Sequence, residues 1–320
     1  MSADALREQL QREFGASLVF ERELPRGGMS RVFVARDAQL GRQVVVKVLA
    51  PELTATLSAE RFKREISLAA RLQHPNIVPL LSAGEVAHRL YYTMPLVDGE
   101  SLRDRMSAER PMAIDAICRI LEDVAGAIAY ANAEGIIHRD MKPENVMFFH
   151  GRAVVLDFGI GKALTASHRA DETRITQAGM SLGTPMYIAP EQGMGDLDLD
   201  HRADIYALGV LAYEMFTGHP PFAGRTPQAV MDQQRKGPPP PVISRRADAP
   251  PGVAQLVMQC LSFSPDARPG SAEAMVDAVR ARHPNVAPAG TGAARIPAWV
   301  PWAIAVISTT IAIGLAVRRG

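Results

Sequence analysis

The sequence His138-Arg139-Asp140-Met141-Lys142-Pro143-Glu144-Asn145, followed 12 positions later by Asp157-Phe158-Gly159, decides how this chain is interpreted. These motifs place two carboxylates, an amide and a lysine at a spacing that suits metal-assisted phosphoryl transfer. One Asp can orient a hydroxyl nucleophile, while Asn145 and the second Asp hold Mg²⁺ against nucleotide phosphates. Asp157-Phe158-Gly159 alone would be typical of a turn after a strand. The order of the two motifs, with the strand-like segment 153–156 between them, disfavours that simpler interpretation.

The composition is that of a globular enzyme. A chain of 320 residues with 47% hydrophobic residues can form one large or two ordinary domains with a sizeable core. Lysine plus arginine (35) nearly balances aspartate plus glutamate (34), so no nucleic acid partner is indicated. Cys118 and Cys260 lie in apolar, helical stretches without metal-ligand spacing, which predicts buried reduced thiols.

The first 17 residues predict an amphipathic extension. Residues 2–14 are polar and charged, and Leu6, Leu10 and Phe14 recur among them at helical spacing. This pattern favours a short helix that packs on the following domain, and it differs from the pattern of a signal peptide.

The C-terminal segment 296–317 contains no formally charged residue. As a helix it would span about 33 Å at ~1.5 Å per residue, enough to cross a bilayer. Trp299 and Trp302 lie at its start, where an aromatic belt is expected, and residues 284–295 before it resemble a flexible linker. We therefore expect a transmembrane helix. Because Arg318-Arg319 at the far end oppose the positive-inside bias, a peripheral segment, a hydrophobic tail or a truncated chain stays open.

Between these ends the periodicity of the chain changes once. Alternating or apolar segments predict strands at 18–20, 32–34 and 44–48, and further strands near 77–81 and 90–94. Between the strands at 44–48 and 77–81, the helical spacing of Phe62, Glu65, Ile66 and Ala69 predicts a helix. Beyond residue 100, helical periodicity dominates, as in 114–132, 205–216 and 253–261. The fold class is therefore α+β, with a small sheet-rich lobe that contains one main helix and a larger helical lobe.

The first lobe contains residues suited to binding phosphates. Gly27 and Gly28 lie between two predicted strands, where the lack of a Cβ lets the backbone approach phosphate oxygens. A plain Gly-Gly hairpin is the alternative. Lys47 follows on a valine-rich strand, in which a charge needs a partner, and Glu65 on the next helix can supply one. A solvated lysine on a sheet edge is the simpler alternative for Lys47.

From residue 18 to 283 the chain resembles a eukaryotic-type protein kinase domain, most similar to bacterial transmembrane serine/threonine protein kinases. The resemblance implies a bilobal fold with an N-lobe over 18–96 and a C-lobe over 97–283. Besides the motifs above, it depends on several others that occur in the family's order: His74-Pro75-Asn76, Met94 to Gly99, Gly183-Thr184-Pro185, Ala189-Pro190-Glu191, Asp204 to Gly209, and Arg268.

The resemblance implies that ATP and Mg²⁺ are the cofactors. Asp140 would be the catalytic base and Lys142 would stabilise the transferring phosphoryl group, while Asn145 and Asp157 would bind the metal. The residues implied to bind the nucleotide are Leu24, Gly27, Gly28, Val32, Val45, Lys47, Glu65, Met94, Leu96 and Met147. Glu191 and Arg268 would form a structural ion pair.

Two positions imply the substrate class. Lys142, two residues after Asp140, and Thr184 before Pro185 resemble serine/threonine kinases rather than tyrosine kinases. The expected acceptors are therefore Ser and Thr hydroxyls of proteins.

Regulation follows from the same resemblance. Arg139 would belong to a basic pocket that a phosphorylated loop neutralises, with Thr176 as the first candidate phosphosite and Thr173 as the second. Autophosphorylation in trans would need two copies of the chain to meet, which makes a homodimer a candidate assembly. Because ATP is cytosolic, a transmembrane anchor implies a single-pass protein of the cell membrane with a cytoplasmic kinase domain.

Two other functions stay open. One is a membrane-anchored pseudokinase scaffold that binds nucleotide or partners without turnover, and the other is a small-molecule kinase of related fold. Pro25 and Ser30 replace the first and third glycines of the family's phosphate loop. Because proline fixes φ and lacks an N–H donor, Pro25 favours weaker nucleotide binding.

Overall fold

The computed structural model describes residues 3–24, 30–51, 54, 59–158, 185–196, 198–224 and 226–281. The chain divides into a unit of residues 1–283 and a unit of residues 284–320, and the described residues all belong to the first. Gly27, Gly28, Thr173, Thr176 and the predicted membrane segment lie outside the described ranges. Within those ranges, no helix is both long enough and apolar enough to cross a membrane.

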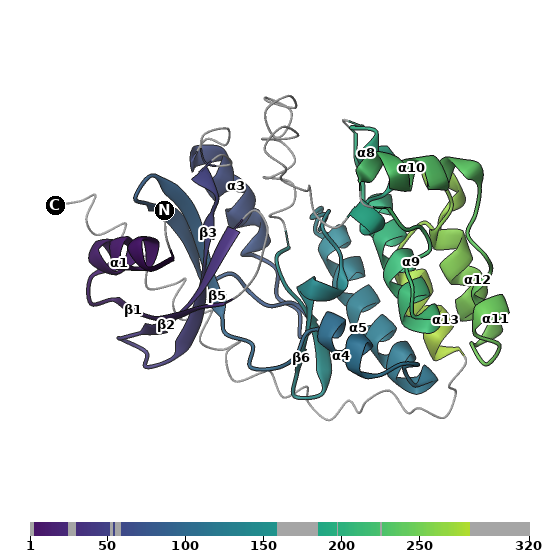
Figure 1. The fold of residues 1–320 in the computed structure, drawn as a ribbon, viewed down its shortest axis with the longest axis horizontal. Helices are drawn as coiled ribbons and strands as arrows, with labels where there is room; N and C mark the ends of the chain where they lie inside the picture. The colour runs from purple at the N-terminus through teal and green to yellow at the C-terminus, as the bar shows by residue number, and fades with distance from the viewer. Residues whose placement is uncertain are drawn as a thin grey trace. The chain divides into compact units, whose positions relative to one another are not determined.

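Five antiparallel strands form the sheet of the first lobe, in the order β1-β2-β3-β5-β4 (Figure 1). The strands span β1 Leu18–Leu24, β2 Ser30–Asp37, β3 Gln43–Leu49, β4 Ser82–Val86 and β5 Arg89–Pro95. The strands predicted at 18–20, 32–34, 44–48 and 90–94 are therefore confirmed.

Among the helices that the structure describes, two pack on opposite faces of this sheet, because alternate residues of a strand point to opposite sides. Helix α1 (Ala3–Phe14) buries Leu6 and Leu10 in a cluster with Val44, Val46 and Val48 of β3. Helix α3 (Ala59–Ala69) buries Phe62, Ile66 and Ala69 in a second cluster that includes Val45 and Leu49. The predicted N-terminal helix and its packing on the domain are thus confirmed. Lys47 lies on the α3 side, in step with Val45 and Leu49.

The strand predicted near 77–81 is wrong in position. Ile77 forms a single parallel bridge with Val155, and the Val78 amide donates to the Val155 carbonyl at 2.9 Å. Pro79 follows directly, and its missing N–H interrupts a ladder of hydrogen bonds. Regular pairing starts only at Ser82, the first residue of β4.

The second lobe is mainly helical, as predicted (Figure 1). Within the described residues, its helices are α4 Leu102–Ala108, α5 Ile114–Ala133, α8 Pro190–Gly193, α9 Arg202–Thr217, α10 Pro227–Lys236, α11 Val242–Arg245, α12 Pro251–Cys260 and α13 Glu273–Arg280. Short 3-10 turns cover Pro143–Asn145, Pro185–Tyr187 and Pro265–Ala267. A two-stranded antiparallel sheet, β6 Val146–Phe149 and β7 Arg152–Val155, lies between the two sequence motifs.

Helix α9 forms the centre of this lobe, and each of its residues from Ala203 to Phe216 is buried. A helix that is buried on all sides lies in the core of a large domain. Its Gly209 allows α12 to approach closely, since a Cβ there would lie 2.6 Å from the Cβ of Cys260. Cys118 and Cys260 are buried reduced thiols, as predicted, and burial raises the pKa of the Cys260 thiol to about 12.

Candidate active site

The loop 138–142, between α5 and β6, is held by a carboxylate of α9. Asp204 is 1% exposed and accepts the backbone N–H of His138 at 2.8 Å and that of Arg139 at 2.9 Å. Arg139 has φ of 65°, a left-handed conformation that is unfavourable for a residue with a Cβ. The two charge-assisted hydrogen bonds to Asp204 therefore fix a backbone shape that the local sequence alone would disfavour.

Three polar side chains of the first motif converge within this loop. Lys142 Nζ lies 2.9 Å from Asp140 Oδ1 and 2.7 Å from Asp140 Oδ2. Asn145 Nδ2 donates to the Asp140 carbonyl at 2.7 Å and to Asp140 Oδ2 at 3.2 Å. The 3-10 turn that starts at Pro143 shortens the path between them, so residues five apart can meet. Because Asn145 donates through Nδ2, its Oδ1 is the atom of this side chain suited to binding a cation.

The His138 ring joins this loop to the strand that leads into Asp157. Its Nδ1 accepts the backbone N–H of Asp140 at 3.2 Å, which leaves Nε2 as the donor to the Leu156 carbonyl at 2.8 Å. The ring also packs edge-on against Phe158, with centroids 4.7 Å apart. The two motifs are thereby brought side by side, although they are separated by a strand pair in the sequence.

Asp157 binds two residues of the sheet in the first lobe. Its Oδ2 forms an ion pair with Lys47 Nζ, 110 positions earlier in the chain, and its Oδ1 accepts the hydroxyl of Tyr92 at 3.0 Å. Burial raises the pKa of the Asp157 carboxyl, but the charge of Lys47 and the hydrogen bonds from Lys47 and Tyr92 lower it below its ordinary value. The carboxylate therefore stays anionic at neutral pH and is suited to a divalent cation.

Glu65 is half-buried on α3, and its pairing with Lys47 stays a prediction. The motifs and periodicity of the sequence do not point to Tyr92. A signal was present in principle, because Tyr92 lies directly opposite Lys47 in the β3–β5 register. That register follows from the tertiary pairing of two strands more than 40 residues apart, so no local motif reveals it.

The apolar residues implied to contact a nucleotide base share one hydrophobic cluster. Its buried members from both lobes include Val32, Val45, Met94 and Met147, and Leu24 and Leu96 pack partly buried against it. Strands β1, β2, β3 and β5 of the first lobe, the residue after β5 and strand β6 contribute these six residues. The cluster thus brings together residues that are far apart in the sequence.

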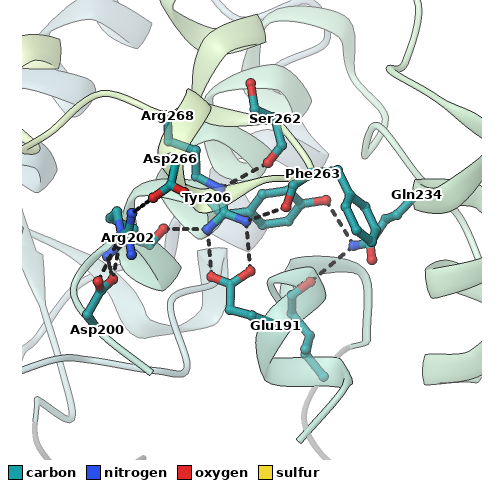
Figure 2. Close-up of polar contacts among 10 residues, drawn as sticks. Glu191, Asp200, Arg202, Tyr206, Gln234, Ser262, Phe263, Asp266 and Arg268 are labelled. Carbon is teal, nitrogen blue, oxygen red and sulfur yellow. Dashed lines mark hydrogen bonds and ion pairs between the residues drawn. The ribbon is translucent and has the colours of Figure 1, made fainter. Parts of the chain in front are cut away.

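Arg268 and Glu191 form a bidentate ion pair, drawn in Figure 2. The guanidinium donates to the two Glu191 oxygens at 2.6 and 2.7 Å and also to the carbonyls of Arg202, Ser262 and Phe263. It lies 4.9 Å from the centroid of the Tyr206 ring. This network connects α8 with α9 and with the segment before α13.

Arg139 connects to the same region through its backbone. Its carbonyl accepts Nε2 of Gln192, the residue after Glu191, at 2.8 Å. Gln234 of α10 donates to the Tyr206 hydroxyl at 2.9 Å and to the Ile188 carbonyl at 3.1 Å (Figure 2). The position of the loop 138–142 thus depends on hydrogen bonds to α8 as well as to α9. The phosphosites predicted at Thr173 and Thr176 lie outside the described residues.

Comparison with known sequences identifies the family of this fold. A family model described as the protein kinase domain matches residues 18–279. Serine/threonine-protein kinase PknB of Mycolicibacterium smegmatis is 40% identical over 269 residues, which are 82% of this chain and 42% of the relative. Serine/threonine-protein kinase pkn3 of Myxococcus xanthus is 39% identical over 257 residues, 78% of this chain and 46% of the relative. The chain thus spans less than half the length of these curated relatives.

Solved structures agree with this family. The crystal structure of the kinase domain of Mycobacterium tuberculosis PknI, determined on a mutant of that protein, is 30% identical with a TM-score of 0.64, and the match covers 83% of this chain and 96% of that one. The structure of Rad53 residues 1–466 in complex with AMP-PNP is 24% identical with a TM-score of 0.63, covering 82% and 64%, and supports the fold alone.

Proposed function

The chain belongs to the protein kinase family, and we propose that it is a serine/threonine protein kinase that transfers the γ-phosphate of ATP to Ser and Thr hydroxyls of proteins. The observation that carries this proposal is the contact of Asp140 with both Lys142 and Asn145, beside the Lys47–Asp157 ion pair. Relatives at 39–40% identity that are named serine/threonine-protein kinases support the substrate class.

Each residue of the first motif has a distinct role in this proposal. Asp140 orients the acceptor hydroxyl and receives its proton as the oxygen attacks. Lys142, held against Asp140 in the free protein, turns its ammonium to the transferring phosphoryl group and offsets its charge. Positioning and charge stabilisation account for most of the catalysis of phosphoryl transfer, so the mutual contacts of these side chains matter more than any one of them.

The donor atoms fit a magnesium–nucleotide complex. The Asp157 carboxylate and the Asn145 amide oxygen are the hard oxygen ligands that Mg²⁺ prefers. When bound, Mg²⁺ would neutralise charge on the phosphate oxygens. Lys47 would bind the α- and β-phosphates with Glu65 as its partner, Gly27 and Gly28 would cover the phosphates, and the apolar cluster with Met94 and Met147 would enclose the base.

An Asp140→Asn variant tests the proposal. Labelled ATP, Mg²⁺ and three peptides that differ only in a Ser, Tyr or Ala acceptor would be incubated with the wild type and the variant. We expect transfer to the Ser peptide alone, and a loss of about 10²- to 10⁴-fold in Asp140→Asn, because the amide cannot accept the proton. ADP binding should be retained, which controls for folding. No transfer by the wild type would favour the pseudokinase scaffold, and equal transfer by the two proteins would reject Asp140 as the catalytic base.

Regulation and location extend this proposal. We place autophosphorylation at Thr176, with Thr173 second, in a homodimer that works in trans, and an anchor at residues 296–317 that keeps the kinase domain on the cytoplasmic side of the cell membrane. Mass spectrometry of the wild type and of Asp140→Asn tests the phosphosites, and unphosphorylated loops in both proteins would reject them. Membrane fractionation of the full chain against a version that ends at Arg295 tests the anchor, which equal solubility would reject.

A further inference from the structure

We propose that Tyr92 is a positioning residue for the Asp157 carboxylate and thereby sets the affinity of the site for Mg²⁺. The inference depends on the proposed function, in which Asp157 is a metal ligand. Tyr92 lies in β5 directly opposite Lys47 of β3, in an antiparallel pair. Residues in opposite positions of such a pair have neighbouring Cβ atoms on the same face of the sheet. The strand pairing alone therefore places the phenol next to the ammonium.

Tyr92 contacts both members of the Lys47–Asp157 ion pair. Lys47 Nζ lies 5.9 Å from the centroid of the Tyr92 ring, within the range of a cation–π contact. The Tyr92 hydroxyl donates to Asp157 Oδ1 at 3.0 Å, while Lys47 binds Oδ2. The three side chains therefore form one triad, in which each carboxylate oxygen has its own donor.

Burial makes the hydroxyl of Tyr92 informative. The residue is 3% exposed, and its ring belongs to the same hydrophobic cluster as Leu90 and Met94. An apolar side chain would fill this position at less cost, because a buried hydroxyl must find a partner. The adjacent Tyr91 points to the other face of the sheet, where its ring packs edge-on against Phe14 with centroids 5.0 Å apart. Tyr91 thus packs through its ring, whereas Tyr92 also uses its hydroxyl to bind Asp157.

The geometry favours support of the metal ligand over competition with the metal. An ionised carboxylate has about four lone-pair positions on its two oxygens. Lys47 and Tyr92 each occupy one, so positions on both oxygens remain for a cation. A single ion pair leaves the carboxylate free to rotate about the Cβ–Cγ bond, whereas donors on both oxygens fix its plane. A carboxylate whose plane is already fixed loses less conformational entropy when Mg²⁺ binds, so the entropic cost of binding is lower.

The test compares Tyr92→Phe with Tyr91→Phe, which removes a hydroxyl from the same strand on the opposite face. ADP affinity is measured by calorimetry at a series of Mg²⁺ concentrations and again without Mg²⁺. Mg²⁺ should increase the affinity for ADP, and we expect Tyr92→Phe to raise the Mg²⁺ concentration at half of this increase about tenfold. This factor corresponds to the lower end of the range for one hydrogen bond to a charged group. Metal-free ADP affinity should stay at the wild-type value, and Tyr91→Phe should match the wild type throughout.

A second variant guards against a folding defect. Tyr92→Met also keeps an apolar side chain without a hydroxyl, so it should show the same shift in Mg²⁺ dependence as Tyr92→Phe. An unchanged or tighter Mg²⁺ dependence in either folded variant would overturn the proposal, since tighter binding would mean that the hydroxyl competes with the metal. The binding readout needs no turnover, so absent phosphorylation by the wild type would reject the proposed function without deciding the role of Tyr92.

Discussion

Arg268 donates to both carboxylate oxygens of Glu191, although 77 positions of sequence separate the two residues. The guanidinium of Arg268 is fully buried, and the Glu191 side chain is 10% exposed. The remaining donors of Arg268 bind three backbone carbonyls, so the charge is satisfied on all sides (Figure 2). This pair holds α8 against α9 and the segment before α13.

Loss of one partner of this pair should destabilise the protein strongly. We expect Arg268→Met to lower the free energy of unfolding by about 3–5 kcal/mol, because the Glu191 carboxylate stays buried without its counter-charge. Urea denaturation measures the change. Arg280→Met is the matched control, since the Arg280–Glu122 pair is largely exposed and should contribute at most ~1 kcal/mol. A loss of similar size in both variants would contradict a special role of the buried pair.

Asp204 should affect turnover more than nucleotide binding. In Asp204→Asn one carboxylate oxygen becomes an NH₂ group, which cannot accept the N–H of His138 or Arg139. The loop 138–142 then loses a charge-assisted hydrogen bond, and we expect kcat to fall about 10- to 100-fold with little change in KM for ATP. Steady-state kinetics measure both. Asp266→Asn, at an exposed ion pair with Arg202, should leave kcat within about twofold.

The N-terminal helix lies outside the family match, which begins at residue 18, yet it should contribute to stability. Leu10 is fully buried between α1 and the sheet. We expect Leu10→Ala to cost about 2–5 kcal/mol of unfolding free energy, because it removes apolar contacts and leaves a cavity. Leu68→Ala, at a 40% exposed position of α3, should cost much less. Equal effects in thermal or urea unfolding would show that α1 does not belong to the folded core.

The stability of the protein should fall on acidification through His74. Burial lowers the pKa of this imidazole below its ordinary value, and the charge of Arg152 lowers it further. Its Nδ1 accepts the backbone N–H of Asn76 at 3.1 Å, which only the neutral ring can do. The unfolded chain therefore takes up the proton first, and the free energy of unfolding should decrease as the pH falls below about 6.5.

Unfolding curves from pH 8 to pH 5 test this dependence. His74→Gln should flatten the decrease in that window, whereas His219→Gln, at an exposed position, should leave it as in the wild type. A decrease of the same size in all three proteins would assign it to other groups.

The local parts of the candidate site could be predicted from sequence. Asp140, Lys142 and Asn145 lie within six residues, so backbone geometry keeps them close once the 3-10 turn forms. The helices of the second lobe follow from a 3.6-residue period, and α1 follows from the same pattern. The strand expected near 77–81 was wrong because its apolar residues satisfy the strand pattern, while Pro79 and the contact with Val155 decide otherwise.

The sequence by itself determined which chemical groups the protein has and which family it resembles, because motif spacing and hydrophobic period are properties of the chain. The tertiary structure decided their partners: Tyr92 as the second donor to Asp157, and Asp204 as the acceptor for the loop 138–142. Those contacts depend on strand register and helix packing over long separations, and many distant apolar contacts fix these together. No short stretch of sequence contains that information.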